Sequence, residues 1–399
     1  MAGRGEGRST VGPMVLGSSV TVVAVLPQFL AGAMAVQITE DLRFGVAGLG
    51  LAVAMFRMTQ ILTSVPLGRL ADRLGAVRSM RAAAAVALVA SIGIALTAQD
   101  LLTLSAWMVF ASCANALGQP AANRLLVHRV PTGRLGFAFG LKQAATPTAS
   151  MLSGFAVPVI ALNWGWRWGY AVGALMALVV IVAVGRRPPV PAAQRPGPGA
   201  SKPRLENRRV VVLLAAAFGC ALLAISVVPT FFVAAAVEAG VSLSRAGVYL
   251  AAGSASAVIV RLIAGHACDR IVVHPLRLAS FMIATGSVGI GMLALMRPWA
   301  MAVGVILALG GAWGFNGVFW YALVGAYRGT PGRITGAMNP GGFAGATLGT
   351  LGFGVVAETL SYTVAWGIAG VIGLVGATAI GLGGRLLASA PRVGGPDPE

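Results

Sequence analysis

The stretch GRLADRLGAVRSMR, residues 68–81, is the most informative part of this sequence. It joins two apolar runs, at about 46–67 and 80–98, and each run is long enough to cross a bilayer as a helix of about 20 residues. A shorter stretch of the same kind, GHACDR at residues 265–270, follows another apolar run. The two stretches indicate a chain built from repeated groups of apolar helices with basic connections between them.

The composition is that of a membrane protein. Of the 399 residues, 57% are hydrophobic and 10% are charged, and the mean hydropathy is +0.84. Because soluble domains carry about 25% charged residues, the composition argues against a soluble enzyme. The apolar runs lack the period-2 alternation of barrel strands, so we expect helices. Twelve spans are predicted, at approximately 14–36, 46–67, 80–98, 101–123, 135–162, 165–184, 210–237, 243–264, 276–296, 299–324, 334–357 and 363–384.

The excess of positive charge follows the predicted topology. The chain has 29 Lys and Arg residues against 11 Asp and Glu residues, a formal net charge of +18. The cations concentrate in alternate connections between spans, which is the positive-inside pattern. The pattern predicts a multi-pass protein of the cell (inner or plasma) membrane with both termini in the cytoplasm. It accounts for the charge without a nucleic-acid partner.

The fold class predicted is an all-α membrane protein made of two six-helix pseudo-repeats. Residues 185–209, rich in Pro and basic side chains, cannot span a membrane and form a cytoplasmic linker. They separate an N-terminal six-helix bundle, residues 1–184, from a C-terminal one, residues 210–399. The stretches 68–81 and 265–270 take equivalent places in the two bundles. Such a duplication is typical of secondary transporters.

The two stretches also resemble a known signature, that of the major facilitator superfamily. The matching positions are Gly68, Asp72, Arg73, Gly75, Arg78 and, in the degenerate second copy, Asp269 and Arg270. The resemblance covers nearly the whole chain and implies a twelve-helix transporter in which these residues form a conformational gate. It implies that Asp72 contacts the start of the eleventh helix and closes the cytoplasmic side without touching substrate. The alternative is a solvated loop turn that only sets the topology.

Apart from cations within the first three residues of a span, three cations fall inside the predicted spans, whereas none of the 11 carboxylates does. A charge at mid-membrane costs about 2.5 to 3.5 kcal/mol and is a functional candidate by default. Arg57, halfway along its span, is the expected principal anchor for an anionic substrate, with Lys142 as a second cation. Arg261 lies close to a basic connection and is a weaker candidate. The alternative for Arg57 is a structural role bonded to backbone carbonyls, and for Arg261 it is snorkelling to the membrane surface.

Four polar side chains inside the spans are further candidates for lining a substrate path. They are Gln28, Asn115, Gln143 and Asn316. An amide in a membrane helix also bonds neighbouring helices, so a structural role stays open for each of them.

The leading functional prediction is a transporter that moves a small organic or inorganic anion by alternating access. The stretch GLKQ, residues 140–143, resembles the cyanate/nitrate-type branch of the superfamily. A proton-coupled drug or metabolite exporter is the alternative, and a non-transporting sensor or scaffold is a third reading. The partners expected are a small, anionic molecule and the lipid bilayer, with the protein as a monomer.

Enzymatic chemistry is not predicted. The three histidines do not cluster with Cys or carboxylate residues, so no metal site is expected. The sequence has no phosphate-binding GxxxxGK[ST] loop, so neither a nucleotide nor another cofactor is expected.

Overall fold

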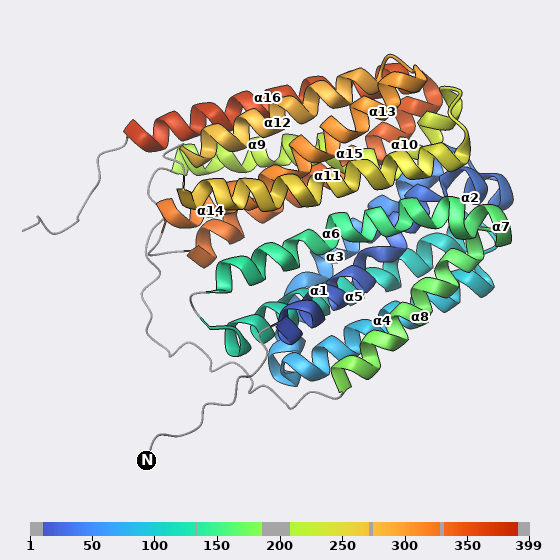
Figure 1. Ribbon diagram of the computed structural model, residues 1–399, viewed down its shortest axis with the longest axis horizontal. Helices are drawn as coiled ribbons and strands as arrows, with labels where there is room; N and C mark the ends of the chain where they lie inside the picture. Colours follow the sequence, from blue (N-terminus) through green and yellow to red (C-terminus); the bar gives the residue numbers. More distant parts are fainter. Residues whose placement is uncertain (1–10, 132–133, 186–207, 271–273, 328–330, 390–399) are drawn as a thin grey trace, which may run out of the picture.

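The computed structural model describes residues 11–131, 134–185, 208–270, 274–327 and 331–389, and these residues are almost entirely helical (Figure 1). We refer to α1–α8 as the N-terminal half and to α9–α16 as the C-terminal half. The N-terminal half contains α1 (Val11–Ala33), α2 (Ala35–Leu42), α3 (Val46–Leu74), α4 (Ala76–Thr97), α5 (Leu101–Arg129), α6 (Leu135–Ala156), η2 (Val157–Ala161), α7 (Leu162–Trp164) and α8 (Trp166–Gly185). The C-terminal half contains α9 (Arg208–Ser226), α10 (Val228–Glu238), α11 (Leu243–Arg270), α12 (Pro275–Leu293), α13 (Pro298–Leu307), η3 (Ala308–Trp313), α14 (Gly314–Ala326), α15 (Pro331–Thr359) and α16 (Tyr362–Ser389). The segments η2 and η3 are π-helical.

Twelve helical segments among the described residues are long and apolar enough to span a membrane, which confirms the predicted number of spans. Three helices run at least six residues further than predicted: α3 continues to Leu74, α5 to Arg129 and α11 to Arg270. Their additional turns are polar, and hydropathy alone cannot follow a helix beyond its apolar part. The predicted boundary between two bundles at residues 185–209 falls mostly on residues outside the described part of the chain and stays a prediction.

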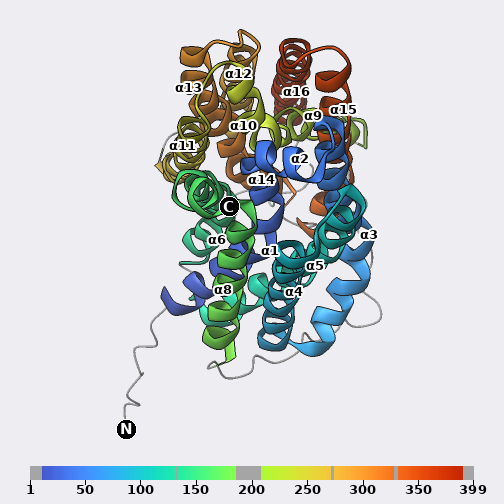
Figure 2. The ribbon, with the colours of Figure 1, turned by 90° about the vertical axis from the view of Figure 1, so that its right-hand side faces the viewer.

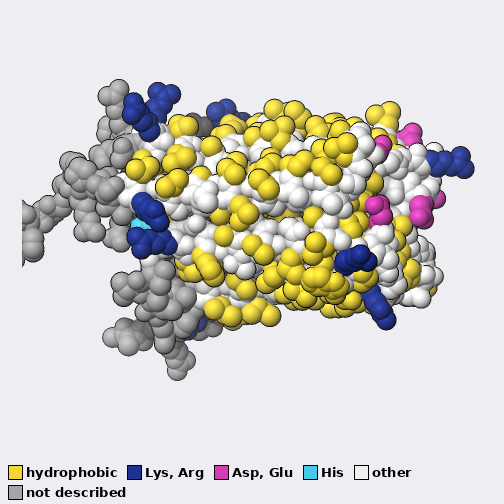
Figure 3. Space-filling view, turned by 90° about the horizontal axis from the view of Figure 1, so that it is seen from above, with side chains coloured by type: hydrophobic (Ala, Val, Ile, Leu, Met, Phe, Trp, Pro, Cys, Tyr) yellow, Lys and Arg dark blue, Asp and Glu magenta, His cyan; other side chains and the backbone are white. Residues whose placement is uncertain are grey.

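The surface separates two ends from a wide hydrophobic band, and on the face in Figure 3 the acidic side chains gather near one end. We call this end the acidic end; it carries Glu40, Asp41, Asp100, Glu238 and Glu358. The opposite end is the basic end; it carries Arg69, Arg73, Arg78, Arg124 and Arg129.

The hydrophobic core is shared by the two halves at the acidic end and divided at the basic end. One cluster of buried side chains contains residues of both halves, among them Phe29, Phe231 and Trp313. Towards the basic end, a second cluster around Met80 belongs to the N-terminal half alone, and a third around Phe319 belongs to the C-terminal half alone. Among the residues that the structure describes, the halves share packed side chains at the acidic end and not at the basic end, so this arrangement is closed at the acidic end.

Two helix pairs make most of the contact between the halves, since α6 packs against α11 and α3 packs against α15 (Figure 2). A smaller contact joins α1 to α10. Small residues allow close approach in the first pair, since a Cβ atom on Gly154 would lie 2.7 Å from the carbonyl oxygen of Gly247. Ser254 also donates a hydrogen bond to Ser150 across the same interface, at 2.9 Å. The contact of Gly154 with Gly247 lies towards the acidic end, and the hydrogen bond between Ser254 and Ser150 lies about halfway along the two spans.

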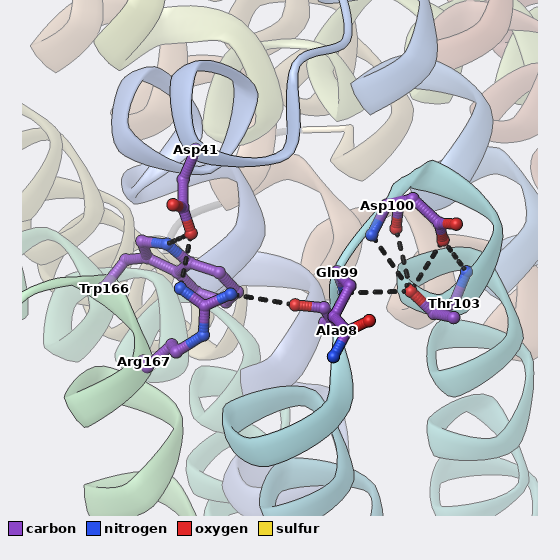
Figure 4. A network of polar contacts seen from close by, with 7 residues as sticks. All are labelled: Asp41, Ala98, Gln99, Asp100, Thr103, Trp166 and Arg167. Atoms are coloured by element: carbon purple, nitrogen blue, oxygen red, sulfur yellow. Dashed lines mark hydrogen bonds and ion pairs between the residues drawn. The ribbon is translucent and has the colours of Figure 1, made fainter.

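A polar network ties α2, α4 and α8 together at the acidic end (Figure 4). The Asp41 carboxylate accepts hydrogen bonds from the guanidinium of Arg167 and from the indole of Trp166. Arg167 also donates to the carbonyl oxygen of Ala98 at 2.9 Å. The hydrogen bond from Arg167 is the main cause that holds the pKa of Asp41 below its usual value. The network fixes the acidic end of the N-terminal half.

Candidate substrate site between the two halves

Arg57 lies on the face of α3 that is turned towards α15. Gly50 identifies this face, because a Cβ atom at that position would lie 2.6 Å from the carbonyl oxygen of Thr350. Arg57 follows Gly50 by seven residues, or about two helical turns, and therefore shares its face. The buried Nε of Arg57 has no hydrogen-bond partner, and no described ion pair contains this side chain. The position thus presents a cation without a partner to the opposite half.

Thr347 occupies the matching position on α15. The two helices are antiparallel, and Gly354 of α15 lies beside Gly50. Counting two turns towards the basic end leads from Gly50 to Arg57 on α3 and from Gly354 to Thr347 on α15. The Thr347 hydroxyl is also buried without a hydrogen-bond partner. Sequence reasoning missed Thr347, since its only signal was a hydroxyl in a glycine-rich span.

Lys142 is already bound by protein groups. Its ammonium donates hydrogen bonds to the side-chain oxygens of Gln119 and Asn123, the latter at 2.8 Å, and the residue is 3% exposed. Both amides project from α5 one helical turn apart, whereas Lys142 lies on α6. The spacing of four residues between Gln119 and Asn123 indicates that the two amides share one face of α5. The sequence did not show that α6 places Lys142 against that face. In this conformation Lys142 is not free to bind a substrate.

Arg261 is also bound by protein groups, and it connects the two halves. Its guanidinium donates to the backbone carbonyl of Gln143 on α6 and, at 2.7 Å, to that of Trp313 at the end of η3. The carbonyl of Gln143 lacks its usual helical donor because Pro147, four residues later, has no N–H. Gln143 therefore contributes a backbone oxygen, and Arg261 is a tether between α11 and α6.

Gln28 and Asn115 face each other across the interface of α1 and α5. Contacts of Gly17 with Ala122 and of Gly118 with Val20 set the antiparallel register of these helices, and the register places the two amides on adjacent turns. Both side chains are buried, and neither side-chain oxygen has a hydrogen-bond partner.

Asn316 is half-buried on α14 and makes no described hydrogen bond. It belongs to a different helix pair from those that carry Arg57 and Gln28. The ring contact of Phe29 with Trp313, 5.7 Å between centroids, links α1 to the helical span that contains Asn316. Nothing described brings Asn316 into direct contact with the other candidates.

Among the described side chains, the predicted gate residues make no contact with α15. Asp72 forms an ion pair with Arg124 of α5, within its own half, and a Cβ atom on Gly68 would have no neighbour within 4 Å. Gly75 makes the tight turn between α3 and α4 with φ of +80°, as its residue type predicted. Two other gate candidates, Arg73 and Arg78, are exposed. Of the second copy, Asp269 and Arg270 end α11, and their side chains lie outside the described part.

The two hollows described in the structure lie away from the three cations predicted in the interior of the spans. Among the described residues, no group of His, Cys, Asp and Glu side chains is placed to hold a metal ion. Two apolar hollows of about 190 Å³ each lie within a single half. Neither is lined by Arg57, Lys142 or Arg261.

Comparisons with known proteins agree with this architecture. In structure the chain resembles the nucleoside transporter NupG, crystallised as a point mutant, with 14% identity and a TM-score of 0.72 over 93% of this chain and 99% of that one. It also resembles a bacterial homologue of the human lysosomal transporter Spinster, in an inward-facing and occupied conformation, with 15% identity and a TM-score of 0.68 over 97% of each chain. Curated protein sequences contain no match to the chain.

At these identities the structural similarity shows the fold alone. The family is shown by the sequence, since the model of the Major Facilitator Superfamily matches residues 17–350, which is most of the chain. The chain is therefore a member of the major facilitator superfamily of transporters.

Proposed function

We propose that this protein is a secondary active transporter that moves a small monoanion by alternating access, with Arg57 as the principal charge that binds it. The observation that carries the proposal is the Arg57 guanidinium, which faces the opposite half with a buried N–H that no protein group accepts. The unpaired hydroxyl of Thr347, at the same level of α15, provides a second donor. A carboxylate or a small inorganic anion would accept hydrogen bonds from both.

Electrostatics supports one negative charge on the substrate. A cation and an anion about 4 Å apart attract by about 4 kcal/mol at an effective dielectric constant near 20, before the cost of dehydrating the anion. Lys142 and Arg261 donate to protein oxygens, which leaves Arg57 as the unpaired cation among the three that were predicted in the interior of the spans. One free positive charge balances a monoanion better than a polyvalent ion.

The distribution of charge supports a cytoplasmic basic end. With that orientation, the described arrangement is closed on the external side and has separate cores towards the cytoplasm. The Spinster homologue, whose structure is described as inward-facing and occupied, has the same fold and supports this assignment by analogy. We find no described contact that favours the exporter alternative over the anion transporter.

Counterflow in proteoliposomes tests the proposal without knowledge of the coupling ion. Vesicles preloaded with unlabelled lactate, nitrate or cyanate receive the same anion in labelled form outside. We expect at least one anion to exchange, and Arg57→Gln to slow that exchange at least tenfold, since tenfold corresponds to only about 1.4 kcal/mol. The control Arg245→Gln removes an exposed cation at the acidic end and should exchange normally. Equal exchange by both variants would overturn the role of Arg57, and exchange of none of these anions would contradict the substrate class.

A further inference from the structure

The first turn of α3 is capped by a carboxylate from the opposite half. Glu358, near the end of α15, accepts a hydrogen bond from the backbone N–H of Ala47, with 2.6 Å between N and Oε2. Ala47 is the second residue of α3, and the residue at the N-cap, Gly45, supplies no side-chain cap. The contact joins residues 311 positions apart in the chain and crosses the interface between α3 and α15.

Such a contact is favourable for two reasons. The first N–H groups of a helix have no acceptor within the helix, so an oxygen from elsewhere satisfies one of them. The N-terminus of a helix also carries a partial positive charge, which favours a carboxylate. Glu358 therefore stabilises α3 only while α15 stays close to it at the acidic end.

Gly45 provides the space that the carboxylate occupies. A Cβ atom at this position would lie 2.7 Å from Cδ and 2.8 Å from Oε1 of Glu358. The backbone of Gly45 is extended, with φ of −84° and ψ of −178°, a conformation open to any residue. The absence of a side chain here thus serves the approach of Glu358 and not the turn itself.

We propose that Glu358 is a gating residue that holds the acidic end closed by capping α3 across the two halves. Opening this end to solvent requires α3 and α15 to separate, which breaks the cap and leaves the Ala47 N–H to water. The cap therefore stabilises the closed state and not the open one, and its loss shifts the equilibrium towards the open state. The proposal concerns the transport cycle and does not depend on the charge of the substrate.

The reporter for opening is a cysteine at position 254, in a background without the three native cysteines. Ser254 is fully buried between α11 and α6, about halfway along the two spans, so Ser254→Cys reacts with a maleimide reagent only when these helices part there. When opening and closing are fast relative to the reaction, the labelling rate measures the open population. No substrate is needed, so this measurement can fail or succeed independently of the anion proposal.

Two variants remove the cap in different ways. Glu358→Ala deletes the carboxylate, and Gly45→Ala displaces it while Glu358 remains. We expect each to raise the labelling rate of Cys at position 254 about fivefold, equivalent to about 1 kcal/mol at 1.4 kcal/mol per tenfold. Glu358→Gln, which keeps an acceptor but loses the charge, should give a smaller increase.

Two controls separate gating from general loosening of the protein. Glu40→Ala removes an exposed carboxylate from the same end that makes no described contact, and it should leave the rate unchanged. A cysteine introduced at Ser287, buried within the C-terminal half, should stay unreactive in every variant. Rates within twofold of the parent protein for both Glu358→Ala and Gly45→Ala would overturn the proposal. An equal rise at position 287 would also overturn it, since it would show loss of structure and not gating.

Discussion

Replacement of Arg57 by methionine separates a binding role from a structural one. A structural arginine contributes hydrogen bonds whose loss destabilises the fold, whereas the Arg57 Nε–H is buried without an acceptor. A buried donor left unsatisfied costs about 1 to 3 kcal/mol. Methionine retains much of the side-chain volume and removes both that cost and the cost of the buried charge. We therefore expect Arg57→Met to be at least as stable as the parent protein.

The size of the effect follows from the same numbers. For domains of about 150 to 250 residues, each kcal/mol of stability shifts the unfolding midpoint by roughly 2 to 4 °C. Removing a penalty of about 1 to 3 kcal/mol therefore raises the apparent midpoint by a few degrees. The assay is thermal unfolding of the purified protein in nanodiscs, with and without lactate, nitrate or cyanate. A bound anion stabilises the parent protein by about 1.4 kcal/mol at ten times its Kd. In Arg57→Met this anion-dependent shift should disappear.

The control is Arg245→Met, which removes an exposed cation and should alter neither the midpoint nor its response to anions. If Arg57→Met lowers the midpoint by several degrees without any anion, the guanidinium supports the fold and the reasoning from its unpaired N–H is refuted.

Three further predictions rest on other contacts of the N-terminal half. Lys142→Met leaves two amide oxygens without their donor and should lower the unfolding midpoint, whereas Lys142→Gln, which keeps N–H donors, should lower it less. Pro147→Ala restores a backbone N–H that donates to the carbonyl of Gln143. This N–H competes with Arg261 for the same oxygen and weakens the tether between the halves, so labelling of the cysteine at position 254 should increase. Because Arg167 lowers the pKa of Asp41 in the folded protein, that ion pair stabilises above about pH 4 and is lost as the pH falls further. Asp41→Asn should therefore lower the free energy of unfolding at pH 7 by less than about 1 kcal/mol, since the pair is partly exposed, and this loss should shrink as the pH falls below about 4.

The helical spans could be predicted from the sequence because hydropathy and length determine them directly. The twelve predicted segments agree with the structure to within a few residues, apart from the polar extensions of α3, α5 and α11. Gly75 and the position of the gate motif also followed from local sequence, since a tight turn requires a residue that accepts positive φ.

The partners of the intramembrane cations could not be predicted in the same way. Lys142 and Arg57 both appear in the sequence as isolated cations in apolar helices, yet α5 supplies two amides to one and no described group pairs with the other. Arg261 is bound because a proline on another helix leaves a carbonyl free. These differences depend on which helix faces lie together, and that information is tertiary.

Glu358 illustrates the same limit at the acidic end. The sequence placed it at the end of a span, where a carboxylate is unremarkable. Its contact with the first turn of α3 depends on the antiparallel packing of α15 against α3 and on the space beside Gly45. The two ends of this helix pair now carry a carboxylate each, Glu358 engaged across the halves and Asp72 engaged within its own half.

The most direct test of the binding site is to locate a bound anion. Crystals of the protein, grown with a brominated analogue of the monoanion that exchanges best, give an anomalous signal at the position of the bromine. The account predicts a peak between α3 and α15, with the anionic group in hydrogen-bond distance of the Arg57 guanidinium and near the Thr347 hydroxyl. A peak elsewhere in the molecule, with the Arg57 guanidinium bonded to protein oxygens, would contradict it.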